Sequence, residues 1–239
     1  MNTHEFALYS KNIIALPITG SKTLVVTNEQ FVHRVKRILR LVPGDQLTLF
    51  DEQHHSLAIV GTVAEKKIEL FLKPSQINTI LQPALTVQLA LLRREALDEA
   101  VAALVATGVS DIQLVLTTKV QRAWGGAREY ERLYRCMIAA AEQSKCFSFA
   151  RLHEPISLPE LFSKNKDSYL LVCDAQGVSL KKDLKSDQAV SILIGPEGDF
   201  TDAEKKLIFE HDYQSWRLTP TVLRSEQAAA LAAGIIRSR

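Results

Sequence analysis

The chain has 239 residues, of which 46% are apolar and 23% are charged. These fractions are ordinary for globular proteins and exclude long disordered or collagen-like segments. The 29 Lys and Arg residues nearly balance the 27 Asp and Glu residues, so the net charge of +2 neither requires nor excludes nucleic acid as a partner.

Cysteine is rare, and the three cysteines have no C-x-x-C spacing: Cys136, Cys146 and Cys173. An odd, scattered set predicts neither a disulfide framework nor a structural zinc site, and it favours a reducing, cytoplasmic location. The longest apolar run worth testing, residues 228–236, is half of the ~18 residues that a membrane span needs. We therefore expect a soluble protein without a bound metal.

Residues 1–72 predict a small, mostly β domain with one helix. The turn signal Pro43-Gly44-Asp45 separates runs of alternating apolar and polar residues. The predicted strands are residues 23–27, 46–50, 57–63 and 67–72. Residues 73–84 contain two prolines and several polar residues, and we interpret them as a linker.

The helix of this first domain carries a run of basic residues from His33 to Arg40. Helical spacing places on one face His33, Lys36, Arg37 and Arg40, and on the opposite, buried face Val32, Val35, Leu39 and Val42. Cations without an acid among them repel one another unless a polyanion lies nearby. We predict a phosphate-binding stripe, with RNA contacts from Arg34, Lys36, Arg37 and Arg40.

From residue 85 to residue 239, predicted strands alternate with predicted helices. The strands are residues 85–92, 112–116, 169–173 and 190–194, and the helices are residues 95–107, 127–145, 201–213 and 225–236. Gly108 stands where a helix C-terminal cap belongs, and Thr201-x-x-Glu204 is a capping-box signature. This alternation is typical of a doubly wound α/β domain with a mostly parallel sheet.

Several common site motifs are absent. The sequence has no Gly-x-Gly pair for a dinucleotide, no Walker phosphate loop and no Gly-x-Ser-x-Gly nucleophile elbow. The pair His54-His55 is isolated, and we assign it to a loop rather than to a metal site.

Two segments remain as candidate sites. Gly195-Pro196-Glu197-Gly198 follows an apolar strand and precedes a capped helix, which is where open α/β sheets bind ligands. The segment from Leu218 to Ala228 begins where a short predicted strand ends, at Leu218. It carries Arg224 and Glu226 on either side of Ser225, the predicted N-cap of the last helix. By local chemistry alone, the first is also compatible with a plain turn and the second with a capping ion pair.

Taken in order, these segments resemble the 16S ribosomal RNA uridine N3-methyltransferases of the SPOUT superfamily, the RsmE-type enzymes. The resemblance spans nearly the whole chain. It is carried by the basic segment with Pro43-Gly44-Asp45, by Ala140-Ala141-Glu142-Gln143-Ser144, by Gly195-Pro196-Glu197-Gly198 and by Leu223-Arg224-Ser225-Glu226.

The resemblance implies a PUA-like β-barrel at residues 1–72 that docks RNA, and a SPOUT domain at residues 85–239 whose chain forms a trefoil knot. It also implies a homodimer acting on 16S ribosomal RNA of the small ribosomal subunit, with S-adenosylmethionine as the cofactor. By analogy, three loops hold the cofactor, and the residues concerned are Cys173, Gly195, Pro196, Glu197, Gly198, Leu218, Thr219 and Leu223.

The chain departs from the usual family pattern at three positions near these loops. Asp199 and Thr219 stand where the family commonly has glycine, and Gln227 stands where it has threonine. If the loop needs a positive φ at residue 219, a β-branched residue there is strained.

Methylation of uracil N3 needs a proton acceptor or a cation that stabilises the uracil anion. We assign the second role to Arg224, while Glu226 either orients Arg224 or accepts the proton. Two alternatives stay open: a SPOUT methyltransferase with another RNA target, and a catalytically impaired RNA-binding assembly factor.

Overall fold

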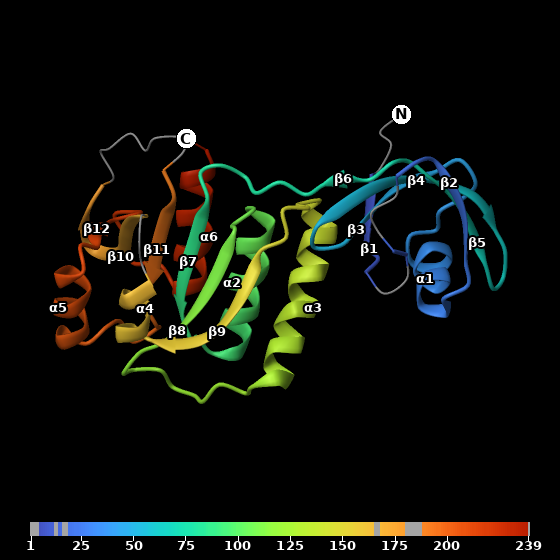
Figure 1. Cartoon of the computed structure of the whole chain (residues 1–239). Coiled ribbons are helices and arrows are strands. Elements are labelled where there is room, and N and C mark those ends of the chain that lie inside the picture. Colours follow the sequence, from blue (N-terminus) through green and yellow to red (C-terminus); the bar gives the residue numbers. More distant parts are fainter. Residues whose placement is uncertain (1–4, 12–13, 16–18, 165–167, 180–187, 239) are drawn as a thin grey trace. The chain divides into compact units, whose positions relative to one another are not determined.

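The computed structural model describes residues 5–11, 14–15, 19–164, 168–179 and 188–238. The chain forms two compact units (Figure 1). Unit 1 comprises Met1–Thr79 and Ala141–Phe149, and unit 2 comprises Ile80–Ala140 and Ala150–Arg239.

Unit 1 is a mostly antiparallel sheet with one helical segment. Its elements are β1 (Phe6–Tyr9), β2 (Lys22–Val26), α1 (Glu29–His33), η1 (Arg34–Ile38), β3 (Gln46–Phe50), β4 (His54–Val63), β5 (Ile68–Leu72) and β6 (Gln76–Ile77). The strand order is β1-β3-β4-β5-β2, and β6 pairs with β4. The four predicted strands are confirmed with small shifts at their ends, whereas β1 and β6 were not predicted. His54 and His55 begin β4, so their assignment to a loop is wrong.

The basic segment of unit 1 is only partly the helix that the spacing predicts. Asn28 caps α1 by accepting a hydrogen bond from the Phe31 amide at 3.0 Å. From Arg34 onward the backbone winds as a π-helix, in which the Leu39 amide donates to the Arg34 carbonyl. Arg40 has a φ of 55° and lies outside this helix.

The wider π turn changes which apolar residues point inward. Val32 and Val35 are buried as predicted, and Leu39 is half-buried. Leu41 is buried, while Val42 is 57% exposed, so the predicted burial of Val42 is wrong. The predicted single basic face, which assumed regular α-helical spacing through Arg40, is wrong for the same reason.

Unit 2 alternates strands and helices around one parallel sheet. Its elements are β7 (Leu85–Ala90), α2 (Arg94–Ala106), β8 (Asp111–Leu116), α3 (Ala127–Ser144, whose last turn belongs to unit 1), β9 (Arg151–Ser157), α4 (Leu158–Lys164), β10 (Tyr169–Val178), β11 (Val190–Ile194), α5 (Asp202–Glu210), β12 (Gln214–Trp216) and α6 (Ser225–Arg237). The strand order is β12-β10-β11-β7-β8-β9, with every pair parallel. The predicted parallel α/β sheet is confirmed; β9 and α4 were not predicted.

The two faces of this sheet are covered differently. On β7, the apolar residues Leu85, Val87 and Leu89 alternate with the polar residues Thr86 and Gln88, of which Gln88 is also buried. Helices α2 and α6 lie behind the sheet in Figure 1, while α4 lies in front of it. Beneath α4 and α5, a core cluster includes Val115, Leu161, Phe162, Val172, Leu193, Phe200 and Ile208.

Helix α6 runs from the carboxyl edge of the sheet to the amino edge. Its last residue, Arg237, donates to the carbonyls of Leu81, Pro83 and Gly108, which precede the first residues of β7 and β8. A helix of 13 residues is about 20 Å long, so its first residues lie toward the opposite, carboxyl edge.

Candidate active site at the carboxyl edge of the parallel sheet

The chain changes direction between β7 and β11, which are neighbours in the sheet. After β7, helix α2 leads to β8 on one side; after β11, helix α5 leads to β12 on the other. A crevice at such a switch point is where open α/β sheets bind ligands. At this point a hydrogen bond joins the two loops: the Glu197 carboxylate, after β11, accepts from the Arg93 amide, after β7, at 2.9 Å.

The predicted cofactor residues come from three loops at this edge. Cys173 lies on β10 beside Trp216 of β12. The segment Gly195-Pro196-Glu197-Gly198 follows β11, and Leu218, Thr219 and Leu223 follow β12. Because these three strands are adjacent and parallel, the loops emerge together. The loop after Cys173 begins as an irregular end of β10, and its residues 180–187 lie outside the described residues.

Phe200 anchors the loop after β11, because its side chain is buried in the core cluster under α5. A Cβ atom on Gly195 would come within 2.9 Å of the Phe200 ring, so glycine is needed for this close approach. The predicted capping box is confirmed. Glu204 Oε2 accepts from the Thr201 amide at 2.8 Å, and the Glu204 amide donates to Thr201 Oγ1.

Backbone strain in this region lies at Asp199 rather than at Thr219. Among the described residues, the non-glycine residues with positive φ are Arg40, Lys145, Asp199 and Asp212. Asp199 has a φ of 59°, which agrees with the glycine that the resembled family has there. Its carboxylate accepts from the Phe200 amide at 2.7 Å and from Lys205 Nζ at 2.6 Å, and this pairing raises the pKa of Lys205.

Thr219 is not among the described residues with positive φ. Its hydroxyl donates to the Thr221 carbonyl at 2.7 Å and so holds the loop after β12 together. The condition for backbone strain at Thr219, a positive φ, is therefore not met. The neighbouring Val222, which the sequence did not single out, is 83% exposed.

Burial raises the pKa of the Cys173 thiol far above its ordinary range. The thiol is therefore protonated at neutral pH. Since the thiolate is the nucleophilic form, Cys173 contributes a small neutral surface rather than a reactive group.

Arg224 and Glu226 begin helix α6. Arg224, and not the predicted Ser225, is the N-cap, and the Arg224 amide donates to Gln227 Oε1 at 3.2 Å. The Gln227 side chain thus caps the start of the helix by accepting from the Arg224 amide. The Arg224 side chain is exposed and that of Glu226 is half-buried. Within the described part of the chain neither side chain forms an ion pair, so the capping ion pair is absent.

The predicted RNA-binding residues of unit 1 divide into two groups. Arg34 forms a two-point ion pair with Glu142 at 2.9 and 2.6 Å, so the expectation of an unopposed basic run is wrong for Arg34. Arg37 and Arg40 are exposed, and Lys36 is half-buried. None of these three forms an ion pair with a described residue.

Three contacts that sequence reasoning missed surround the loop after β11: the Arg93 amide to Glu197, Lys119 Nζ to the Gly198 carbonyl at 2.9 Å, and the Thr118 amide to Glu204 Oε1 at 2.7 Å. Thr118 and Lys119 follow β8, which is not adjacent to β11. No motif signals these contacts, because they depend on the order of strands in the sheet.

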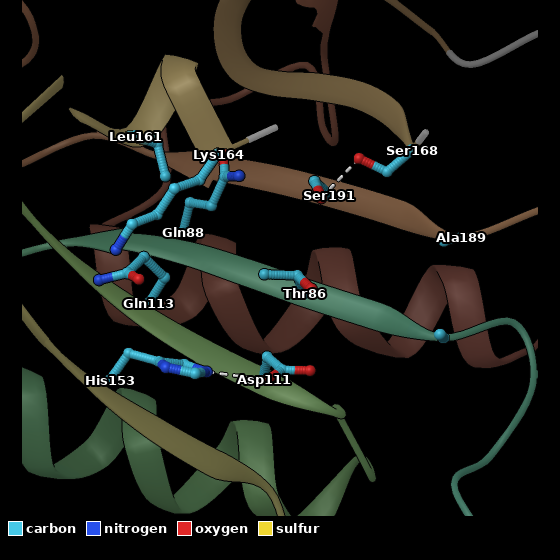
Figure 2. A pocket seen from close by; sticks show the side chains of 11 residues that line it. Thr86, Gln88, Asp111, Gln113, His153, Leu161, Lys164, Ser168, Ala189 and Ser191 are labelled. Atoms are coloured by element: carbon cyan, nitrogen blue, oxygen red, sulfur yellow. Dashed lines mark hydrogen bonds and ion pairs between the residues drawn. The ribbon is translucent and has the colours of Figure 1, made fainter. Parts of the chain in front are cut away.

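A separate cavity of about 320 Å³ opens at the amino ends of the strands, on the face that carries α4 (Figure 2). It is lined by polar residues, among them Thr86, Gln88, Asp111, Gln113, His153 and Ser191. His153 Nε2 lies 2.8 Å from Asp111 Oδ1, and the Ser168 and Ser191 hydroxyls are 3.0 Å apart. Burial opposes ionisation of Asp111, but its bonds to His153 and Arg151 outweigh it and lower the Asp111 pKa.

Within the described ranges, no three His, Cys, Asp or Glu side chains form a group able to hold a metal ion. The helices of these ranges include none with the length and apolar character needed to cross a bilayer.

Comparison with known proteins agrees with the fold. A family model described as an RNA methyltransferase domain matches residues 81–237. The ribosomal RNA small subunit methyltransferase E of Rickettsia conorii is 25% identical over 235 residues, which cover 96% of this chain and 95% of that protein. The protein of the same name from Mycobacterium bovis is 26% identical over 239 residues, covering 92% of this chain and 88% of its own.

Among solved structures, the ribosomal RNA small subunit methyltransferase E from Neisseria gonorrhoeae, crystallised with S-adenosylmethionine, superposes with a TM-score of 0.82 at 22% identity. The match covers 98% of each chain. A probable rRNA methyltransferase from Porphyromonas gingivalis has a TM-score of 0.76 over 98% of this chain and 97% of its own, also at 22% identity. The chain therefore belongs to the RNA methyltransferase domain family, as the RsmE-type resemblance of its motifs implies.

Proposed function

We propose that this chain is an S-adenosylmethionine-dependent methyltransferase that methylates N3 of one uridine in 16S ribosomal RNA of the small ribosomal subunit. The observation that carries the proposal is the meeting of three loops at the switch point of the sheet, with Arg224 and Glu226 at the start of α6, in a chain of the RNA methyltransferase family.

The residues at this edge fit S-adenosylmethionine. Gly195, Pro196, Glu197 and Gly198 lie in the loop after β11, and Leu218, Thr219 and Leu223 lie in the loop after β12, so these two loops would hold the cofactor. The exposed Val222 and the half-buried Leu218 and Leu223 offer apolar surface suited to an adenine ring. Protonated Cys173 does not compete for the methyl group.

When bound, this cofactor supplies a methyl group on a positively charged sulfur atom, and that charge disappears as the carbon–sulfur bond breaks. The chain has three tasks: to bind, to orient, and to manage the proton on uracil N3. Arg224 stabilises the negative charge that spreads onto the uracil carbonyl oxygens when N3 loses its proton.

Glu226 accepts that proton. In the described structure Glu226 does not hold the Arg224 guanidinium, which favours proton acceptance over an orienting role. The N3–H bond breaks toward the Glu226 carboxylate, and the N3 electron pair forms the bond to the methyl carbon. The target uridine must leave any stacked or paired position to reach this edge.

We also propose the family's architecture for the two units: a PUA-like barrel that docks RNA through Lys36, Arg37 and Arg40, and a SPOUT domain with a trefoil knot. Beside the cofactor loops, β12 lies close against an irregular end of β10: Cys173 and Val178 both pair with Trp216, and Gly177 packs directly against the backbone of Trp216 and Arg217.

A homodimer through α6 is part of the proposal. Ala229, Ala232 and Ala233 are buried within unit 2, so these small residues serve packing inside the unit. Leu231 is 37% exposed on the same helix and offers an apolar contact to a second copy. Sedimentation velocity tests this: a dimer is expected, and a monomer at all concentrations contradicts it.

The function is tested by adding the protein and tritiated S-adenosylmethionine to small ribosomal subunits from a strain that lacks the gene. We expect one methyl group per 16S RNA, located on uridine N3 by mass mapping. Arg224→Ala should lower transfer at least ~100-fold while the cofactor Kd stays within a few-fold. Arg224→Lys keeps the charge but loses the planar fork, and should recover only part of the rate.

The exposed Lys206 of α5 provides the control, since Lys206→Ala also removes one cation. Methylation at another atom or in another RNA would contradict the proposed function. Full activity in Arg224→Ala would contradict only the role of Arg224.

A further inference from the structure

Lys119 lies in the segment that joins β8 to α3, outside the three loops assigned to the cofactor. Its ammonium donates to the Gly198 carbonyl at 2.9 Å and to the Phe200 carbonyl at 3.3 Å. These two carbonyls stand on either side of Asp199, the residue with a φ of 59°. Lys119 therefore holds the turn at its strained residue.

The stem of Lys119 adds a second contact to the same turn. A Cβ atom built on Gly198 would lie 3.4 Å from Lys119 Cδ and 3.7 Å from Lys119 Cβ. The aliphatic part of the side chain thus covers the Gly198 α-carbon while the ammonium binds the carbonyls.

The segment that carries Lys119 is itself fixed on both sides of this residue. The Thr118 amide donates to Glu204 Oε1 at 2.7 Å, and Glu204 is 7% exposed. Farther along, Arg93 Nε donates to Gln121 Oε1 at 2.8 Å, and Arg122 Nε donates to the Leu92 carbonyl at 2.6 Å. The segment around Lys119 is therefore held to α5 through the Thr118 amide, and to the residues after β7 through the side chains of Gln121 and Arg122.

We propose that Lys119 is a positioning residue for the cofactor: it fixes the Gly195-Pro196-Glu197-Gly198 loop by binding the carbonyls around Asp199. The inference rests on the proposed function of that loop. A glycine at position 199, as the RsmE-type family commonly has, forms the left-handed turn without strain. In this chain Asp199 occupies that position, and the turn is stabilised by Lys119 at the Gly198 carbonyl and by Lys205 at the Asp199 carboxylate.

The proposal assigns Lys119 no contact with the reacting atoms, so its loss should affect binding and leave the chemical step intact. Lys119→Met keeps the stem and removes the donor. Titration calorimetry with S-adenosylmethionine, at a temperature far below the midpoint of thermal unfolding, should show a Kd raised roughly tenfold, as expected for the loss of a charged hydrogen bond. The KM for the cofactor should rise in parallel, with kcat at saturating cofactor within about twofold.

Two further variants make the test specific. Lys119→Arg retains a donor and should restore most of the affinity, whereas the control Lys206→Met, at an exposed lysine of α5, should leave the Kd unchanged. In an Asp199→Gly background, Lys119→Met should raise the Kd by a smaller factor, because glycine adopts the turn without support.

The outcomes separate the two proposals. If the unaltered protein does not bind S-adenosylmethionine, the proposed function fails. If it binds and Lys119→Met binds equally well, the positioning role alone is overturned. A lowered kcat at saturating cofactor with an unchanged Kd also overturns it, since that would place Lys119 in the chemical step.

Discussion

The two terminal nitrogens of Arg34 donate to the two carboxylate oxygens of Glu142, at 2.9 and 2.6 Å. The same carboxylate accepts the Tyr9 amide at 2.9 Å. Glu142 therefore joins β1, the basic segment and the end of α3 within unit 1. Because its side chain is only 12% exposed, we interpret the Arg34 ion pair as a structural element of unit 1 rather than as part of a free RNA-binding stripe.

Glu142→Gln should lower the free energy of unfolding by roughly 1–3 kcal/mol, because the amide loses the charge and turns a donor toward Arg34 or Tyr9. Urea denaturation measures this. Glu65→Gln is the matched control in the same unit: Glu65 is exposed and forms no ion pair with a described residue. Equal stability of the two variants would contradict the structural role of Glu142.

The remaining cations of the basic segment are the ones expected to bind RNA. Reversing charge at Arg37 and Arg40 should weaken binding to 16S RNA and lower the slope of log K against log salt by roughly 1–2, since each lost phosphate contact removes about 0.7–0.9. Lys66→Glu with Lys67→Glu supplies a control of equal charge change at the exposed turn before β5. An equal change of slope in the control would show that only net charge matters.

The sequence correctly predicted those elements that depend on residues close together in the chain. Strands β3 and β11 were predicted with the observed bounds, and the Thr201 capping box formed as its spacing indicated. Each depends on alternation or on contacts within a few residues.

The errors arose where distant residues or an irregular backbone decide the outcome. The basic run was expected to be unopposed at Arg34 because its partner Glu142 is 108 positions away in the sequence. Val42 was placed in the core because the π-helical turn after Arg34 is not visible in the spacing. At the candidate site, the three loops were expected from the family resemblance. The contacts of Lys119 with the loop after β11, and of Thr118 with Glu204, became recognisable only once strand order placed β8 near that loop.

The Glu204 carboxylate predicts a pH dependence of stability. Burial raises its pKa, but hydrogen bonds from Thr201 and Thr118 outweigh burial and lower the pKa below the usual 4.5. A carboxylate whose pKa is lower in the folded state stabilises the protein above the usual value, and this contribution is lost as the pH falls through the folded pKa.

Glu204→Gln should therefore lower the free energy of unfolding by roughly 1–3 kcal/mol at neutral pH, and the difference from the unaltered protein should shrink as the pH falls below 4.5. Guanidinium denaturation across this range measures it. Glu210→Gln, at the exposed end of the same helix, should show almost no difference at either pH. A difference that stays constant with pH would mean that the Glu204 charge is not responsible.

Gly177 tests how tightly β10 packs against β12 beside the cofactor loops. A Cβ atom there would meet Ser215 Oγ and would lie 3.0 Å from the Trp216 amide nitrogen and 3.1 Å from that of Arg217. The hydroxyl can rotate away, but the two backbone nitrogens cannot without moving β12. Gly177→Ala should therefore lower the free energy of unfolding by roughly 1–3 kcal/mol and weaken cofactor binding, because β10 and β12 lead into two of the three loops. Gly20→Ala is the control, since a Cβ atom at residue 20 would meet nothing within 4 Å. Calorimetry and chemical denaturation on both variants decide the matter: if Gly177→Ala keeps full stability and affinity, β10 and β12 do not pack as tightly as the structure shows.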